Sequence, residues 1–418
     1  MGNKSGVPFE RGRMRGNMKI LMVNKFLYPN GGSETYIFKL GEYLNAHGHE
    51  VQFFGMEHEG RIVGNSAENY TSDMDFHTGK LKKILYPFKI IYSLEARKKI
   101  RKVLEDFKPD VVHLNNFNFQ LTPSIIYEIR SFGKKCGKIP VIIYTAHDYQ
   151  WVCPNHMMRI PSTGELCERC MKEGFKACSK HNCIHNSKVK SILGSVEAYL
   201  YKGLKTYRYV DTIICPSRFL KEKLDKYDIL KDKTKVLHNF IEKKEWMDTE
   251  KEDYVLYFGR YTKEKGVETL MQVCRELPEI SFVFAGGGDL ETQLAEIPNV
   301  NNLGFLQGEK LEETIRKARF SVFTSEWYEN CPFSVMESQM YGTPIIAADI
   351  GGTPELVEAG RTGELYVSGD KDALKATVEK LWKDRELCEK YRENCKNIQF
   401  DTIEKYCDKL MKLYRKEN

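Results

Sequence analysis

The chain has 418 residues, which suits two α/β domains of about 200 residues each better than one hydrophobic core. A hydrophobic content of 41% with 29% charged residues is typical of a soluble globular protein. No run approaches the roughly 20 apolar residues that a membrane-spanning helix needs. The first 17 residues carry three arginines but no apolar segment, so we expect no secretory signal. We interpret them as an irregular N-terminal extension, or place the true start near Met14 or Met18.

The net charge of +6 divides unevenly along the chain. Residues 1–250 hold 41 Lys and Arg against 28 Asp and Glu, and the remaining residues hold 23 against 30. The segment 80–104 has nine basic residues and one acid, interleaved with Ile, Leu, Tyr and Phe. This pattern favours contact with an anionic membrane surface, and a solvated helix face is the alternative. Because the segment lacks any recognisable reading motif, we expect no nucleic-acid partner.

Apolar strands and amphipathic helices alternate through the first half of the chain. The helix is 34–49, and the strands are 18–26, 50–55, 109–116, 140–148 and 210–217. Strands that are apolar on both faces and separated by helices predict a parallel sheet. A Cys/His-rich insert at 151–190 interrupts this pattern, so residues 18–245 are expected to form an N-terminal domain with an insert.

The second half repeats the α/β pattern. Its strands are 253–260, 280–288, 320–326 and 343–349, and a helical tail starts near Lys371. The charged stretch 241–253 separates the halves, which predicts a second domain over 246–418. In parallel sheets ligands bind beyond the carboxyl ends of strands, so chemically important residues are sought there.

The segment after strand 320–326 has the features of an anion site. Pro332 suits the first turn of a helix, with Asn330 or Cys331 as its cap. The amides of Phe333 and Ser334 would then point, unpaired, beyond the strand. Glu329 and Glu337 lie on either side of these amides in the sequence. Because carboxylates would repel a phosphate, the two are expected to bind flanking sugar hydroxyls, unless they are ordinary surface residues.

One cation ends strand 253–260 and a second follows it, and glycines follow three other strands. Arg260 and Lys265 suit a diphosphate, since the planar guanidinium of Arg260 can donate two parallel hydrogen bonds and the ammonium of Lys265 is a compact positive charge. Glycine turns let the backbone approach a phosphate, although ordinary tight turns are the alternative. The glycines concerned are Gly31 and Gly32 after the first strand, Gly287 after strand 280–288, and Gly352, beside Thr353, after strand 343–349.

These residues together resemble the retaining glycosyltransferases of family 4, which have the GT-B fold of two Rossmann-like domains facing each other across a cleft. Glu329 and Glu337 match its E-x7-E element, and Arg260 and Lys265 match its G-R-x-x-x-x-K-G element. The resemblance implies that Glu329 faces the donor sugar and that Glu337 binds the nucleotide ribose. It implies that the two cations stabilise the departing diphosphate.

The first domain matches the family more loosely. Gly31, Gly32 and Glu34 fit its GG-x-E element, which implies amides facing the donor phosphates, and His147 fits its histidine near the reacting sugar. Ser217 and Asn239 fit two further elements, although Phe240 replaces the usual glycine and leaves the tightness of that turn in doubt. His113, at another strand end, is expected to be structural.

The resemblance implies a hexosyltransferase-like enzyme that retains configuration and needs no metal or other cofactor for catalysis. Its donor would be a UDP, GDP or ADP sugar, and its acceptor a lipid-linked or saccharide molecule in cell-surface polysaccharide synthesis. Together with the basic first half, this predicts a cytoplasmic enzyme, peripheral on the inner face of the plasma membrane. The alternatives are another enzyme of this fold, such as a nucleotide-sugar epimerase, or a non-catalytic zinc-containing binding module.

The insert holds five of the twelve cysteines, with histidines nearby. A C-x2-C pair with further Cys and His within thirty residues is rich enough in ligands for a structural zinc. The ligands favoured are Cys167, Cys170, Cys178 and Cys183, with Cys153 as the fifth thiol. An iron–sulfur cluster or free cysteines are the alternatives. Since the insert follows strand 140–148, it is expected to order a loop on the acceptor side.

Overall fold

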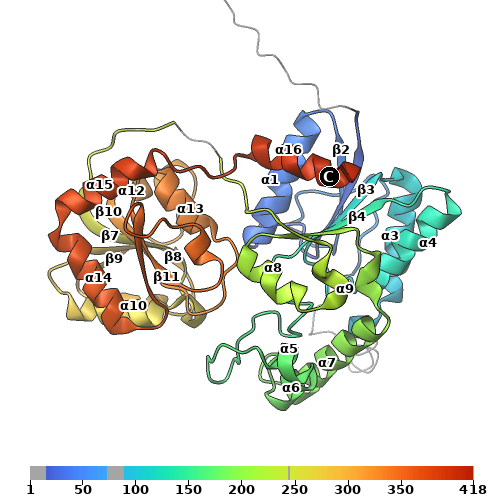
Figure 1. The fold of residues 1–418 in the computed structure, drawn as a ribbon, viewed down its shortest axis with the longest axis horizontal. Helices are drawn as coiled ribbons and strands as arrows, with labels where there is room; N and C mark the ends of the chain where they lie inside the picture. The colour runs from blue at the N-terminus through green and yellow to red at the C-terminus, as the bar shows by residue number, and fades with distance from the viewer. Residues whose placement is uncertain (1–15, 73–88, 243–244, 418) are drawn as a thin grey trace, which may run out of the picture.

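The computed structural model describes residues 16–72, 89–242 and 245–417 (Figure 1). Its first sheet is wholly parallel, with the strand order β2-β1-β3-β4-β5-β6. The strands are β1 Lys19–Val23, β2 Glu50–Phe54, β3 Val111–Leu114, β4 Val141–Thr145, β5 Thr212–Cys215 and β6 Thr234–Val236. β2 and β3 lie on opposite sides of β1, so the loops after β1 and β3 converge at this switch point.

Helices cover both faces of this sheet, as its two-sided apolar strands require. Leu21 and Val23 point into the core under α3 and α4, whereas Ile20 and Met22 point into the core under α1. The helices are α1 Gly32–Ala46, α3 Leu94–Phe107, α4 Ser124–Lys135, α8 Arg218–Asp225, α9 Asp228–Lys231 and the 3-10 turn η1 Thr206–Tyr209. Of the basic segment 80–104, residues 80–88 lie outside the described residues.

The second sheet is also parallel, with the order β12-β11-β10-β7-β8-β9. Its strands are β7 Glu252–Arg260, β8 Phe282–Gly287, β9 Val300–Asn302, β10 Ala318–Phe323, β11 Ile345–Asp349 and β12 Gly363–Val367. Its helices are α10 Val267–Glu276, α11 Glu291–Leu294, α12 Glu309–Lys317, α13 Phe333–Met340, α14 Lys371–Lys383 and α15 Arg385–Cys395. The topology switches between β7 and β10, so the loops after these two strands meet.

The last helix, α16 Ile403–Arg415, packs on the first sheet beside α1 (Figure 1). Its buried stripe includes Tyr406 and Tyr414, whose hydroxyls contact the Tyr36 hydroxyl at 2.8 Å and His113 Nδ1 at 2.7 Å. The sequence predicts a second domain over residues 246–418, whereas this helix belongs by its contacts to the first domain. Between the domains, Ile241 donates its amide hydrogen to Asp401 O at 2.9 Å. The segment that enters the second domain and the segment that returns to α16 therefore run side by side.

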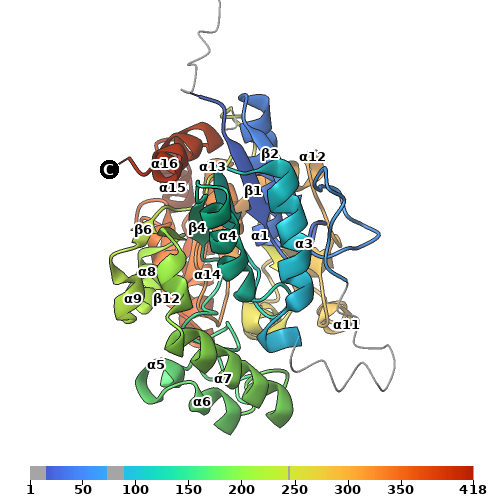
Figure 2. The ribbon, with the colours of Figure 1, turned by 90° about the vertical axis from the view of Figure 1, so that its right-hand side faces the viewer.

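The insert forms a small helical layer below the first sheet (Figures 1 and 2). It contains α5 Arg169–Glu173, α6 Lys176–Lys180 and α7 Lys188–Gly203. The insert therefore extends beyond its expected end at residue 190, because α7 continues as one helix to Gly203. Among the described residues, no helix combines the length and the apolar character needed to cross a membrane.

Candidate active site at the facing switch points

Glu329 lies in the loop between β10 and α13 and is 8% exposed. Its Oε1 accepts hydrogen bonds from Lys265 Nζ at 2.5 Å, Trp327 Nε1 at 2.6 Å and Ser325 Oγ at 2.9 Å. A buried carboxylate needs such partners to offset its lost hydration. The three donors therefore fix the orientation of a carboxylate that projects at the switch point of the second sheet.

Lys265 reaches Glu329 because the loop after β7 packs tightly against the loop after β10. The 3-10 turn η2 Lys263–Lys265 ends at Gly266, whose φ of +67° is a left-handed conformation. A Cβ at Gly266 would lie 1.8 Å from the Thr324 carbonyl oxygen, so only glycine fits there. Thr324 Oγ1 in turn donates to the Lys265 carbonyl at 2.8 Å. These contacts place the Lys265 ammonium and the Glu329 carboxylate, from the loops after two different strands, side by side.

Arg260 is the last residue of β7, and its side chain is exposed. It pairs in register with Gly287, the last residue of β8, so both lie at the same edge of the sheet. A Cβ at Gly287 would meet nothing within 4 Å, whereas Gly286 and Gly288 lie against neighbouring backbone. Gly287 therefore leaves open space beside Arg260.

Helix α13 begins at Phe333, with Pro332 as its cap. The prediction of Pro332 in the first turn, with Asn330 or Cys331 as the cap, is wrong by one or two positions. Pro332 has a ψ of 124°, which is extended backbone, so it precedes the helix. The amides of Phe333 and Ser334 are nevertheless the first of the helix, and amides in a first turn have no partner within it.

Glu337 lies one turn further along α13 and faces the first domain. Burial raises the pKa of its carboxyl above the ordinary value, while the charge of Lys39 on α1 lowers it. Gly32, at the start of α1, also lies close to α13, since a Cβ there would lie 3.8 Å from the Phe333 ring. The Gly31–Gly32 turn after β1 thus faces the N-terminus of α13.

Glu34 holds this glycine turn in place. It is buried, and its Oε1 accepts from Asn24 Nδ2 and Ser33 Oγ, both at 2.9 Å. Asn24 Oδ1 also accepts from the amide of Asn116 at 3.0 Å, which ties the loops after β1 and β3 together. The first sheet therefore presents its own switch point to the second.

His147 follows β4 and contacts the second domain. Its Nε2 lies 2.9 Å from Asn115 Oδ1, and its carbonyl accepts a hydrogen bond from Asn330 Nδ2 at 2.8 Å. Burial lowers the pKa of His147 to about 3, so the ring is neutral near pH 7. Because Asn115 Oδ1 can only accept, Nε2 carries the proton and Nδ1 is the acceptor of the ring. His113 is fully buried between Tyr414 and Thr145, in agreement with the structural role expected for it.

Glu355 joins the domains at a second point. Its carboxylate accepts from the amides of Arg218 at 2.8 Å and Phe219 at 2.9 Å, at the N-terminus of α8, and lies 2.9 Å from His238 Nε2. Burial raises the pKa of Glu355, but these hydrogen bonds outweigh it and hold the pKa below the ordinary value. No local pattern could have revealed these contacts, since the partners lie more than a hundred residues away.

The insert brings its thiols together in pairs. The Cys153 thiol contacts Cys170, and the Cys178 thiol contacts Cys183. These four cysteines are buried, whereas Cys167 is only partly buried. Within the described ranges, no group of three or more His, Cys, Asp or Glu side chains is arranged to hold a metal ion. The structural zinc at Cys167, Cys170, Cys178 and Cys183 stays a prediction, and binding it would require these pairs to rearrange.

Two parallel α/β domains have facing switch points, with a glycine turn on the first and a cationic loop on the second. With the family matches below, they define a glycosyltransferase of the GT-B class. Residues 30–245 match the family described as Glycosyltransferase Family 4, and residues 239–398 match the family described as Glycosyl transferases group 1. The chain belongs to glycosyltransferase family 4. The expected fold class and family are both confirmed.

Relatives of known sequence and structure agree with this family. O-antigen chain mannosyltransferase C of Escherichia coli is 22% identical, over 90% of this chain and 92% of that protein. An uncharacterized 42.6 kDa protein in the cps region of Klebsiella pneumoniae is 25% identical, over 81% of this chain and 87% of that protein. Sucrose-phosphate synthase from Thermosynechococcus elongatus has a TM-score of 0.69 at 18% identity, covering 96% and 99% of the two chains. HepE of Anabaena, solved in complex with UDP, has a TM-score of 0.65 at 15% identity, covering 96% and 100%.

Proposed function

We propose that this glycosyltransferase moves a sugar, with retention of configuration, from a nucleotide sugar to a lipid-linked or saccharide acceptor in cell-surface polysaccharide synthesis. The observation that carries the donor assignment is the Lys265–Glu329 contact beside the first turn of α13, opposite Gly32. Support also comes from HepE, solved with UDP, and from the O-antigen mannosyltransferase of E. coli.

Arg260, Lys265 and the amides of Phe333 and Ser334 are proposed to take the charge that grows on the departing nucleoside diphosphate. An ammonium has three donors, so Lys265 can keep its bond to Glu329 while it binds a phosphate oxygen. Preorganised donors of this kind cost no rearrangement during the reaction, and losing one typically costs on the order of 10²–10³ in rate. With these groups in place, neutralising the diphosphate needs no metal ion.

The two glutamates and His147 are proposed to orient the sugars. Glu329 is held rigidly by three donors and would accept from hydroxyls of the donor sugar, and Glu337 would accept from the ribose. Neutral His147, tied to Asn330, would position the donor sugar or the acceptor at the domain junction. The departing phosphate itself would take the proton of the acceptor hydroxyl, so we assign no general base.

The enzyme is proposed to act in the cytoplasm, at the inner face of the plasma membrane. In the described part of the basic segment, Arg97 and Arg101 both pair with Glu128, whose single carboxylate offsets one of their two positive charges. Lys98 and Lys102 remain exposed on α3 and are the charges there that could meet anionic lipids.

Thermal stabilisation tests the donor site directly. We expect one of UDP, GDP and ADP to raise the Tm of the purified protein, and its sugar conjugate to raise it further, since a ligand bound only to the folded state stabilises it by mass action. The shift should shrink in a Lys265→Ala variant and persist in Lys263→Ala, whose side chain is 67% exposed on the same turn. If no nucleotide shifts the Tm at millimolar concentration, or if Lys265→Ala responds like the parent, the assignment fails.

A further inference from the structure

Helix α7 has most of its large apolar residues on the outside. Its buried face consists largely of small or polar side chains, among them Ser191, Gly194, Ser195 and Glu197. Six of the thirteen large hydrophobic side chains that are exposed in the described part of the chain fall in this one short stretch. They are Val189, Ile192, Val196, Tyr199, Leu200 and Leu204.

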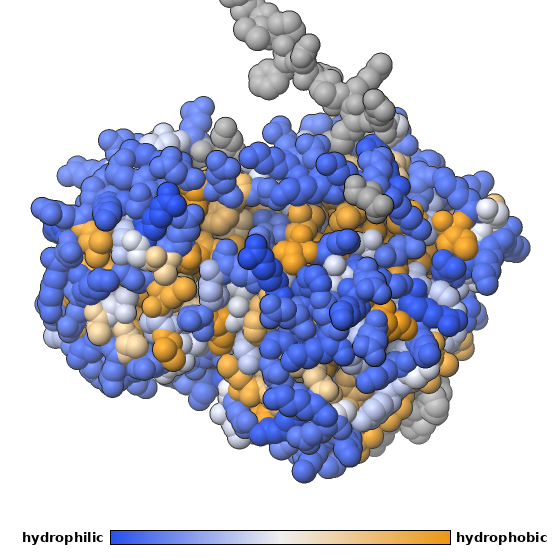
Figure 3. Space-filling view, in the orientation of Figure 1, coloured by the Kyte–Doolittle hydropathy of each residue, from blue (hydrophilic) through white to orange (hydrophobic). Residues whose placement is uncertain are grey.

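These six side chains share one face. Successive spacings of three or four residues place Val189, Ile192, Val196 and Leu200 in a single stripe along the helix. Exposures of 66% at Val189, 47% at Val196 and 51% at Leu204 show that the stripe stays open along its length. Figure 3 shows apolar residues along the lower right edge of the molecule, where Figure 1 places α7. Isolated exposed apolar residues are ordinary, but a continuous stripe marks a contact surface.

The buried side of α7 makes specific contacts within the insert. Ser191 Oγ accepts from the amide of Ile184 at 2.9 Å, and Ser195 Oγ donates to the Phe175 carbonyl at 2.8 Å. Gly194 packs so closely on Ile184 that a Cβ would lie 2.4 Å from its Cδ1. The helix therefore cannot rotate to bury the stripe without losing these contacts.

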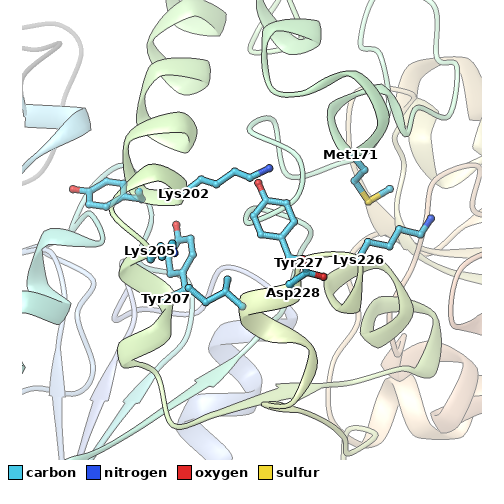
Figure 4. Close-up of a pocket in the computed structure, with 9 residues that line it drawn as sticks. Met171, Lys202, Lys205, Tyr207, Lys226, Tyr227 and Asp228 are labelled. Atoms are coloured by element: carbon cyan, nitrogen blue, oxygen red, sulfur yellow. The ribbon is translucent and has the colours of Figure 1, made fainter.

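A hollow of about 400 Å³ lies between α7 and α9 (Figure 4). Lys202 points across it, and its Nζ stands 4.2 Å from the ring centroid of Tyr227. Lys202 is thus engaged within the fold, on a different face from the stripe. The hollow does not extend the apolar surface.

The charge around α7 identifies the partner. Residues 169–205 hold eight Lys and Arg against two Glu, and one of these, Glu197, is buried. Lys188 is exposed at the start of α7, and Lys176 lies beside the stripe, since its amide donates to Tyr199 Oη at 3.3 Å. Apolar side chains flanked by lysines suit the interface of an anionic bilayer, where the apolar groups enter the acyl boundary and the ammonium groups stay among the phosphates.

We propose that the outward face of α7 docks this protein on a bilayer that contains anionic phospholipids. The surface lies in the insert, on residues that come after the basic segment 80–104 in the sequence. Its position below the first sheet would bring a lipid-linked acceptor to the domain assigned to acceptor binding (Figure 2). That last point rests on the proposed function, whereas the docking itself does not.

Vesicle flotation without donor or acceptor tests the docking alone. We expect the protein to bind vesicles of phosphatidylcholine with one third phosphatidylglycerol, and to bind pure phosphatidylcholine far less. The triple variant Ile192→Ser, Val196→Ser and Leu200→Ser should lose about tenfold or more in affinity, because each apolar side chain contributes through its buried area. Lys176→Glu with Lys188→Glu should weaken binding only to the anionic vesicles.

A matched control replaces exposed apolar residues elsewhere, namely Leu303, Phe305 and Val367 of the second domain, by serine. It should bind anionic vesicles like the parent. Equal vesicle binding by the α7 triple variant and the parent, or failure of the parent to bind anionic vesicles, would overturn the proposal. So would a lipid-free parent that sediments as a dimer while the triple variant sediments as a monomer, since the stripe would then join two copies. Unchanged thermal unfolding of the triple variant excludes misfolding as the cause of lost binding.

Discussion

Asn330 of the second domain donates a hydrogen bond from its side-chain amide to the backbone carbonyl of His147 in the first domain, at 2.8 Å. Asn330 follows Glu329 directly, and the His147 ring is held by Asn115. One contact therefore links the loop that carries the proposed sugar-binding carboxylate to the histidine on the acceptor side. This bond therefore helps to fix the relative position of the two groups.

Replacing Asn330 by alanine should impair catalysis more than stability. A single neutral hydrogen bond contributes about 1 kcal/mol to folding, so the free energy of unfolding in urea should fall by about that amount. The kcat/KM should fall about tenfold, because small misplacements of reacting groups are costly. Asn394→Ala is the control, since Asn394 Nδ2 makes the same kind of bond, at 2.8 Å, to the Arg361 carbonyl within the second domain. A normal kcat/KM in Asn330→Ala would show that the interdomain bond is not needed.

Lys265→Ala should lower kcat by on the order of 10²–10³, about 3–4 kcal/mol of transition-state stabilisation. The reason is twofold, because the variant loses a cation for the leaving group and leaves the buried Glu329 without its ion pair. Glu329→Gln separates the two effects, since it keeps Lys265 free for phosphate while removing the carboxylate. Steady-state kinetics with the donor identified by thermal shift should show a raised KM for Lys265→Ala. Full turnover after truncating both Lys265 and Arg260 would exclude their proposed role.

The zinc prediction is tested by metal content. Thiolates in a C-x2-C pair with two further cysteines suit Zn²⁺, so about one zinc per chain is expected by elemental analysis. Cys170→Ser and Cys178→Ser should each lose the metal and lower the Tm, whereas Cys136→Ser should keep both, since Cys136 is exposed on another part of the chain. Iron with visible absorbance would favour a cluster instead, and zinc-free parent protein with a normal Tm would refute the site.

Much of the fold could be predicted because buried parallel strands are apolar on both faces. The range 253–260 predicted one strand almost as the structure has it, Glu252–Arg260, and charged or glycine residues directly after such strands necessarily lie at one edge of a sheet. Glu329 and Lys265 were found in this way. Their mutual contact depends on Gly266, whose close approach to Thr324 is a tertiary effect.

Other features depend on partners far away in the sequence. The periodicity of residues 403–415 predicts a helix but not the domain that buries it, and its Tyr406 meets Tyr36 across a separation of 370 residues. Pro332 was misplaced by one residue because proline is acceptable both as a cap and in a first turn. Local patterns thus predicted elements and candidate residues, whereas the contacts that join the domains came only from the structure.

Glu355 gives a prediction about stability and pH. Glu355→Gln should lower the free energy of unfolding at pH 7 by about 1–3 kcal/mol, because the amides of Arg218 and Phe219 and the ring of His238 lose a charged acceptor. The pKa of Glu355 is lower in the folded state than its ordinary 4.5, so its contribution is fully present above that value and is lost as the pH falls through the folded pKa.

Urea unfolding of the parent and of Glu355→Gln should therefore differ at pH 7 and converge as the pH is lowered below about 4.5, since protonation abolishes the charge that the substitution removes. Glu358→Gln is the control, because Glu358 pairs at the surface with Arg361 and both side chains are at least half exposed. Exposed pairs contribute little, so this variant should match the parent at both pH values. If Glu355→Gln also matches the parent at pH 7, the carboxylate does not hold α8 against the second domain.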